Sequence, residues 1–317
     1  SCRRASATFS LDGGPRAGQA VPALAIVESM ANQPQDLARR LVGDVDSAAD
    51  LTVLQWNMLA DWATKTDQKS GTASAECLAW PGRRERLLRL LRDGLPEPAD
   101  VLCLQEVDHP EDLLRPLAEQ GYLGHFEPKG GGRDGCCLLI RRDRFEVVSM
   151  RRVAYEAPEA GGEPWSQVAI VAEIAHKHSG RRLQVATTHL KAKAGHEAVR
   201  REQVRQLLAA LGSDRPVIVA GDFNDVPSSD ACALMRAHPL ADAYASLLGE
   251  DLPWTTWKHQ LGEEKKRTID YIWYTKSALR PRACLAIPLD EEVGPARLPS
   301  WQYPSDHLSL VARFAWA

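Results

Sequence analysis

The chain has 317 residues, of which 44% are hydrophobic and 26% are charged, as in ordinary globular proteins. Its net charge of −3 argues against long nucleic acid as the main partner, because proteins that grip nucleic acid usually carry a basic total. No apolar run approaches the roughly 18 to 20 residues that a spanning helix needs, so we expect no membrane insertion. Seven cysteines without CxxC spacing favour free thiols in a reducing, intracellular compartment.

Residues 1–49 lack sustained periodicity, apart from a short helix predicted over residues 34–41. The first 20 residues contain Arg3, Arg4 and Arg16 but one acid, Asp12, a composition typical of a mitochondrial transit segment. A disordered tail or a shortened N-terminus is the alternative interpretation. We therefore predict a tail or targeting segment over 1–49, one domain over 50–317, and a cytoplasmic or mitochondrial location.

From residue 51 onward, short apolar runs alternate with helical stretches, which predicts a layered α/β fold with helices on both faces of sheet. Helices are predicted over residues 76–92, 111–120 and 196–211. Strands are predicted over residues 51–56, 100–107, 136–140, 167–174, 183–190, 216–223, 269–274 and 308–316.

Several of these strands end abruptly in side chains that bind metal, phosphate or a proton. They are Asn57, Glu106, His189 with Lys191, and Asp222 with Asn224. Two further sets belong to the same pattern: Asp270 lies in the strand predicted over 269–274, and Asp306 with His307 directly precede the strand predicted over 308–316. Each has a structural alternative: a salt bridge for a strand-end acid, a turn for an Asn or an Asp-x-Asn, a packing role for a single His. Because such residues occur at six strand ends, the pattern favours hydrolysis of a phosphoester.

The chemistry of each residue type supports that prediction. An ionised Glu106 after five mainly apolar residues would be costly unless paired or bound to a cation, and Mg²⁺ prefers such oxygen ligands. Alternation along an extended segment would place Asp222 and Asn224 on the same side, where they could align a water. Asp270 or Asp306 could fix the tautomer of His307 and favour its cationic form.

The motifs WN, LQE, THLK, GDFN, TIDYIW and SDHLSL together resemble the endonuclease/exonuclease/phosphatase superfamily, in particular its deadenylase-like branch. The resemblance runs from residue 51 to the C-terminus and makes 50–317 a catalytic domain. It implies a four-layer α/β (α+β) sandwich, with two packed mixed β-sheets flanked by helices. It also implies that Glu106, with help from Asn57, binds Mg²⁺ and that Asp306 lies beside the metal. By the same resemblance, Asp222 and Asn224 position the attacking water. His189 and His307 stabilise the phosphoryl charge, and Asp270 orients His307.

The resemblance implies two substrates: the 2′-phosphate of NADP⁺ or NADPH, and poly(A) RNA. Lys129, Lys191 and Lys193 match cationic phosphate contacts, although Lys193 replaces an Arg and the loop over 129–134 is short. Trp257 could stack on a base, unless it belongs to the core. Our leading hypothesis is a monomeric NADP(H) 2′-phosphatase. A poly(A)-specific 3′-exoribonuclease and a non-catalytic scaffold are the alternatives.

Overall fold

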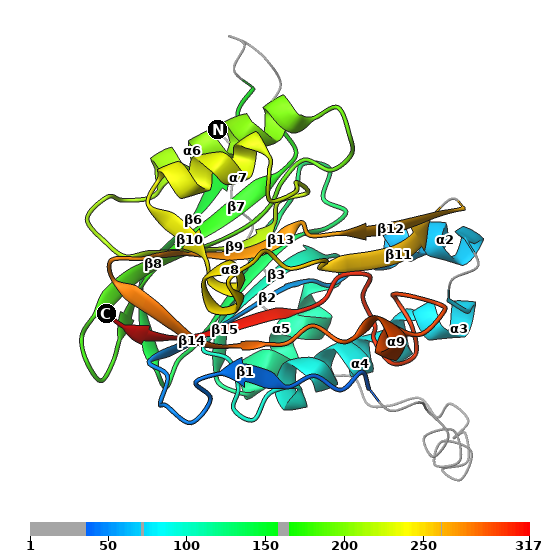
Figure 1. Ribbon diagram of the computed structural model, residues 1–317, viewed down its shortest axis with the longest axis horizontal. Helices are drawn as coiled ribbons and strands as arrows, with labels where there is room; N and C mark the ends of the chain where they lie inside the picture. The colour runs from blue at the N-terminus through cyan, green and yellow to red at the C-terminus, as the bar shows by residue number, and fades with distance from the viewer. Residues whose placement is uncertain (1–35, 71–72, 158–164, 261) are drawn as a thin grey trace, which may run out of the picture. The chain divides into compact units, whose positions relative to one another are not determined.

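The computed structural model describes residues 36–70, 73–157, 165–260 and 262–317 (Figure 1). The predicted transit segment lies outside these residues. Two large mixed sheets dominate the described part of the chain. The first contains seven strands in the order β1 (Leu41–Gly43), β14 (Leu279–Leu285), β15 (Leu310–Trp316), β2 (Leu51–Asn57), β3 (Val101–Val107), β5 (Gly135–Arg141) and β4 (Tyr122–Pro128).

The second sheet has six described strands and contains one parallel pair among antiparallel neighbours. Its order is β10 (Leu240–Asp242), β13 (Asp270–Thr275), β9 (Val217–Asp222), β8 (Arg182–His189), β7 (Val168–His176) and β6 (Phe145–Ala154). A separate hairpin pairs β11 (Thr256–Gln260) with β12 (Glu263–Arg267). The helices are α2 (Asp61–Ser70), α3 (Ala75–Leu78), α4 (Trp80–Asp93), α5 (Pro110–Glu119), α6 (Glu197–Ala210), α7 (Asp230–Ala237), α8 (Ala243–Leu248) and α9 (Asp290–Val293).

Three hydrophobic cores separate four layers. The first core lies between the sheets, where Val53 and Cys103 of one meet Val185 and Ile218 of the other. The second core packs α4 and α5 against the outer face of the first sheet, and the third packs α6 and α7 against the outer face of the second. Figure 1 shows the sheets lying between these helix pairs. The predicted four-layer sandwich is confirmed.

The helix predicted over residues 34–41 is wrong for its described part. Residues 36–40 are irregular and Leu41 begins β1, an edge strand whose partner in β14 is Leu285. Arg39 fixes this path because its guanidinium donates to the carbonyls of Ala286 (2.9 Å) and Ser309 (2.6 Å). Bonds to distant strands replace the bonds of a helix here. Residues 36–49, which precede the predicted start of the domain, thus contribute a strand to the first sheet.

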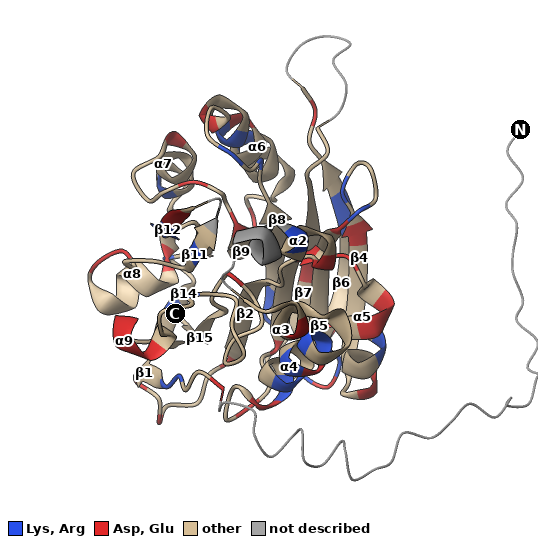
Figure 2. Cartoon of the chain, turned by 90° about the vertical axis from the view of Figure 1, so that its right-hand side faces the viewer, with Lys and Arg blue, Asp and Glu red and all other residues tan. Residues whose placement is uncertain are grey.

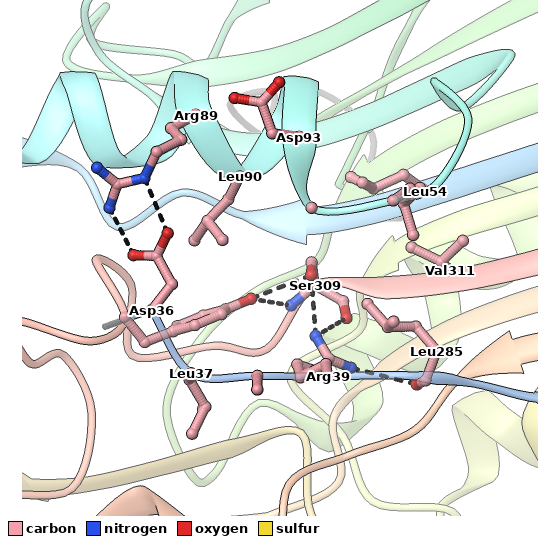
Figure 3. Close-up of a pocket in the computed structure, with 14 residues that line it drawn as sticks. Asp36, Leu37, Arg39, Leu54, Arg89, Leu90, Asp93, Leu285, Ser309 and Val311 are labelled. Atoms are coloured by element: carbon pink, nitrogen blue, oxygen red, sulfur yellow. Dashed lines mark hydrogen bonds and ion pairs between the residues drawn. The ribbon is translucent and has the colours of Figure 1, made fainter. Parts of the chain in front are cut away.

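A cavity of about 260 Å³ lies beneath this segment (Figure 3). Asp36 closes one side of it by pairing with Arg89 of α4, at 2.5 Å between Oδ1 and Nη2. Leu54 and Val311 of the first sheet contribute apolar wall. None of the polar strand-end residues lines this cavity.

Six cysteines lie in the described residues, and all of them are buried and free. Burial raises the pKa of the Cys136 thiol to about 12, so the thiol stays protonated and unreactive. Within the described ranges no helix is both long and apolar enough to cross a membrane.

Candidate active site

The strand topology brings the predicted polar residues to one end of both sheets. In the first sheet, parallel β2 and β3 place Asn57 opposite Gln105. In the second, parallel β8 and β9 place His189 opposite Asp222, and antiparallel β13 begins beside them with Asp270. The carboxyl ends of parallel strands share one edge of a sheet, which explains why strand-end residues far apart in sequence meet here.

Two buried glutamines join the two sheets beneath this end. Gln55 of β2 donates to Oδ1 of Asp270 (3.0 Å) and to Gln105 (2.8 Å). Gln105 of β3 in turn donates to the hydroxyl of Thr187 in β8 (3.0 Å). These bonds cross the sandwich where the apolar core ends, and they fix the distance between the two halves of the site. Neither glutamine was among the predicted site residues.

Glu106 is aimed at the site by an irregularity in β3. Leu102 and Leu104 face the core beneath α4 and α5, and regular alternation would send Glu106 the same way. Instead the pairing with β5 shifts between Leu104 and Val107, and Val107 takes the place in that core. Glu106 itself has a φ of +55°, a strained value for a non-glycine residue. The bulge therefore turns a carboxylate out of the core and toward the site.

The carboxylate of Glu106 is held from two sides. Its Oε1 accepts from Nδ2 of Asn57 (3.2 Å) and its Oε2 from the backbone N–H of Ala60 (3.0 Å). Burial would raise the pKa of Glu106, but His189, Lys129 and the Ala60 N–H lower it to about 2. Glu106 is therefore an ionised carboxylate in a fixed position, and it could hold a cation.

Asp222 and Asn224 are brought together by a turn, and the extended segment predicted for them is wrong. The strand β9 ends at Asp222, and Asn224 has a φ of +51°. Oδ1 of Asp222 accepts from the Asn224 N–H (2.8 Å), while the Asn224 amide donates to the carbonyl of Leu190 (3.2 Å). Burial, together with the charge of Asp270, raises the pKa of Asp222 to about 7. A carboxylate of that pKa suits a general base near neutral pH.

His307 and Asp270 form the predicted acid–imidazole pair. Nδ1 of His307 lies 2.9 Å from Oδ2 of Asp270, which also accepts from the hydroxyl of Thr255 (2.6 Å). Burial would lower the pKa of His307, but the carboxylates of Asp270 and Asp306 raise it to about 10. His307 is therefore a cation, with Nε2 directed to Oδ2 of Asp222 at 3.9 Å.

Asp222, Asp270 and His307 are close enough to hold a metal among them. The hydrogen bonds argue for another use. Asp270 already accepts from Gln55, Thr255 and His307, and a protonated His307 has no lone pair to donate. Without a metal, the trio is arranged to hold a proton and to stabilise charge, and Glu106 stays the predicted metal ligand.

His189 sits between an ammonium group and a carboxylate. Its Nδ1 lies 2.9 Å from Nζ of Lys129, and its Nε2 lies 3.4 Å from Oδ2 of Asp222. Burial, with the charge of Lys129, lowers the pKa of His189 well below its usual value. Lys129 is fixed in turn by Asp134, at 2.8 Å. Among the three predicted lysines, Lys129 contacts this cluster directly, through its ammonium group beside His189.

The remaining predicted residues occupy less direct positions. Asp306 is buried and ion-paired to Lys258, a residue that the sequence analysis missed. Trp257 is 5% exposed, with Lys266 3.8 Å and Arg297 4.2 Å from its ring centre, so its ring is already covered. Lys191 and Lys193 follow β8 on a loop, half-buried and exposed respectively.

A buried arginine supports the Glu106 side of the site, and the sequence analysis missed it as well. Arg83 of α4 is fully buried, and its Nη1 donates to the carbonyls of Met58 (2.9 Å) and Leu59 (2.7 Å). Leu59 has a φ of +57°, an unfavourable value that needs such support. The next residue, Ala60, supplies the N–H that binds Glu106. Arg83 is thus a positioning residue.

We expect Arg83→Met to weaken Mg²⁺ binding several-fold and to lower the free energy of unfolding by roughly 1 to 3 kcal/mol, because it leaves two buried carbonyls without donors. Isothermal titration with Mg²⁺ and thermal unfolding measure the two effects. Arg84→Met is the matched control, since Arg84 is the next residue of α4 and is partly exposed beside Glu85. If both variants bind Mg²⁺ with equal affinity, Arg83 does not position the metal-binding side of the site.

The donor set at Glu106 fits Mg²⁺, which takes one or two carboxylates and fills its other positions with water and substrate phosphate. Asn57 has a second function in the structure. Its Nδ2 donates to both Glu106 and Asp222 (3.0 Å), and its Oδ1 accepts from the Leu59 N–H (3.1 Å). Asn57 therefore holds two carboxylates at a fixed spacing, and its ligation of a metal stays a prediction.

Comparison with known proteins agrees with this geometry. The model of the endonuclease/exonuclease/phosphatase family matches residues 54–307, and the chain belongs to that family. Within it, the chain is similar to nocturnin: it is 38% identical to human nocturnin over 84% of this chain and 65% of the relative, and 38% identical to the Xenopus laevis protein over 83% and 72%. The chain thus spans about two thirds of the length of these relatives.

A solved structure of the human nocturnin catalytic domain with bound sulfate superimposes with a TM-score of 0.72 at 34% identity, over 90% of this chain and 100% of that one. ANGEL2, described as a 2′,3′-cyclic phosphatase, gives a TM-score of 0.72 at 21% identity, over 87% of this chain and 98% of that one, and shares the fold. Carbon catabolite repressor protein 4 homolog 1 of Arabidopsis thaliana is 30% identical over 84% of this chain and 58% of the relative.

Proposed function

We propose that this protein is a divalent-metal-dependent phosphoesterase that removes the 2′-phosphate of NADP⁺ or NADPH. The observation that carries the proposal is the convergence of Glu106, Asp222, His189 and His307 at one end of the sandwich, held by Asn57 (3.0 Å to Asp222) and Asp270 (2.9 Å to His307). This set combines a candidate cation ligand, a base whose pKa is near 7 and an imidazolium whose raised pKa keeps it charged at neutral pH.

The residues divide the work of hydrolysis among them. Glu106 would hold Mg²⁺, which when bound supplies positive charge to the phosphate oxygens. Asp222, with a pKa near 7, accepts the proton of the attacking water. His307 is cationic and Lys129 reaches the same cluster, so both place positive charge where negative charge develops on the phosphoryl group. Asp270 keeps His307 protonated and oriented.

Two observations on charge, together with a ligand bound to a relative, support a small phosphomonoester as the substrate. Lys129 gives the site one fixed ammonium group, which suits a phosphomonoester carrying two negative charges. A chain with a net charge of −3 is poorly suited to follow a long polyanion. A sulfate bound to the catalytic domain of human nocturnin is consistent with a small tetrahedral anion as ligand of such a domain.

The second candidate is a 3′-exoribonuclease acting on poly(A). It is favoured by the relative in Aspergillus clavatus that is named a 3′-5′-exoribonuclease subunit, 25% identical over 84% of this chain and 53% of the relative. The reaction chemistry at phosphorus would be the same, and the difference would lie in how the nucleotide is held outside the cluster.

One comparison separates these candidates. With Mg²⁺ present, NADP⁺ and NADPH are expected to release phosphate and the dephosphorylated dinucleotide, while an adenylate oligomer stays at full length. Chromatography of the products measures both activities. Shortening of the oligomer without turnover of NADP⁺ would establish the exonuclease instead, and no reaction with either would point to a non-catalytic scaffold.

A further inference from the structure

An exposed tryptophan lies two residues after Ala60, whose N–H holds Glu106, and it takes no part in the chemistry described above. Trp62, in the first turn of α2, is 44% exposed, an unusual state for the largest apolar side chain. Its backbone is fixed, because its N–H donates to Asp108 (3.3 Å) and Ala60, two residues earlier, binds Glu106. The position of Trp62 is therefore set by the metal-ligand side of the site.

Arg133 approaches the same tryptophan from the other side of the site. Its guanidinium carbon lies 5.7 Å from the centre of a Trp62 ring. Arg133 belongs to the glycine-rich loop between β4 and β5, and the next residue, Asp134, is buried and pairs with Lys129. The Gly130 N–H ties the loop to the carbonyl of Ser166 (2.7 Å). The position of Arg133 is thus set by the His189 side.

The contact between Trp62 and Arg133 therefore joins the segment that holds Glu106 to the loop that carries Lys129. Trp62 comes two residues after Ala60, which holds Glu106. Arg133 comes directly before Asp134, which holds Lys129 beside His189. The helix α2 also contacts β11, which carries Lys258, the partner of Asp306. Figure 2 faces this end of the molecule, with α2 near the centre of the view. A flat, partly exposed indole here is available to a planar group of a substrate whose phosphate lies in the cluster.

We propose that Trp62, held in place by Arg133, is the stacking platform for a base of the nucleotide substrate. This inference rests on the proposed function and adds to it a residue that selects a nucleotide over a simple phosphomonoester. Aromatic faces bind bases of every kind, so the ligand is defined as a planar nitrogen heterocycle linked to the phosphate through ribose. In NADP⁺ that group is either the adenine or the nicotinamide.

The test measures binding without turnover. In the full chain carrying Glu106→Gln, we expect adding Trp62→Ala to raise the Kd of NADP⁺ roughly ten- to hundredfold, and adding Trp62→Phe to restore most of the affinity. Inorganic phosphate, which has no base, should bind equally to all three proteins. Adenosine 2′-monophosphate identifies the base: an equal loss assigns adenine, and a loss confined to NADP⁺ assigns nicotinamide.

Unchanged NADP⁺ affinity in the Trp62→Ala protein would overturn the inference, as would an equal weakening of phosphate binding. Thermal unfolding confirms that each variant is folded, which is expected because Trp62 is exposed. The binding measurement and the activity measurement can fail separately. Hydrolysis of NADP⁺ by the parent protein with no effect of Trp62 would overturn this inference alone, and Trp62-dependent binding without hydrolysis would overturn the activity alone.

Discussion

Replacing Glu106 by Gln is expected to reduce phosphoester hydrolysis by roughly a thousandfold or more, because the site would lose the carboxylate that we propose as the metal ligand and with it several kcal/mol of charge stabilisation. The substitution keeps the shape of the side chain. A glutamine amide can still accept from the Ala60 N–H or from Asn57, so the surrounding loop should keep its conformation. The loss should therefore be one of metal binding and not of folding.

Two measurements establish this separation. Isothermal titration should show Mg²⁺ binding to the parent protein and none to Glu106→Gln, while the melting temperature without metal stays close to that of the parent. Glu146→Gln is the matched control, because Glu146 lies exposed on β6 and should retain full activity. If Glu106→Gln still hydrolyses substrate with the Mg²⁺ dependence of the parent, Glu106 is not the metal ligand.

Replacing Asp270 by Asn is the second large effect, with an expected fall in kcat of about a hundredfold or more. Asp270 is the buried charge that keeps His307 protonated, at 2.9 Å. Without it the pKa of His307 falls from about 10 toward its ordinary value, and the cation that stabilises the phosphoryl group is lost at neutral pH.

The sign of the pH dependence distinguishes this role from a structural one. His307 is charged below its pKa, so activity should be lost as pH rises through that value. In the parent protein the alkaline decline of kcat/KM should appear near pH 10, and in Asp270→Asn it should move down by several pH units. Asp242→Asn, which removes another buried carboxylate farther from the site, should leave the alkaline decline unmoved. An alkaline decline at the same pH in Asp270→Asn as in the parent would contradict the assignment.

Much of the fold could be predicted because its central strands are buried on both faces and read as continuous apolar runs. The eight predicted strands are all present, with ends shifted by one or two residues. The other seven described strands were missed: β1, β4, β6 and β10 lie at sheet edges, β14 lies next to β1, and β11 and β12 form a separate hairpin. These strands are short or partly exposed, so they lack the continuous apolar run that marks a central strand. The helix predicted near residue 34 failed because bonds from Arg39 to distant strands determine that segment.

The residue types of the site could also be predicted from the strand pattern, but their arrangement could not. A polar side chain at either end of an apolar strand stands out in sequence, and that pattern pointed to Glu106, Asp222, Asp270 and His307, which the structure brings together. What sequence could not supply is geometry. The bulge that turns Glu106, the turn that joins Asn224 to Asp222, and the support from Arg83 all depend on partners distant in sequence. Trp257 shows the opposite error, since a plausible stacking residue is covered by Lys266 and Arg297.

The most direct test of the account is to follow NADP⁺ by phosphorus NMR while the protein acts on it in the presence of Mg²⁺. The three phosphorus atoms of NADP⁺ give separate signals, so the experiment shows which bond is cut. We predict that the 2′-phosphate signal is replaced by inorganic phosphate while the diphosphate signals remain, and that chelation of Mg²⁺ stops the reaction. Cleavage of the diphosphate, or an unchanged spectrum, would contradict the proposal.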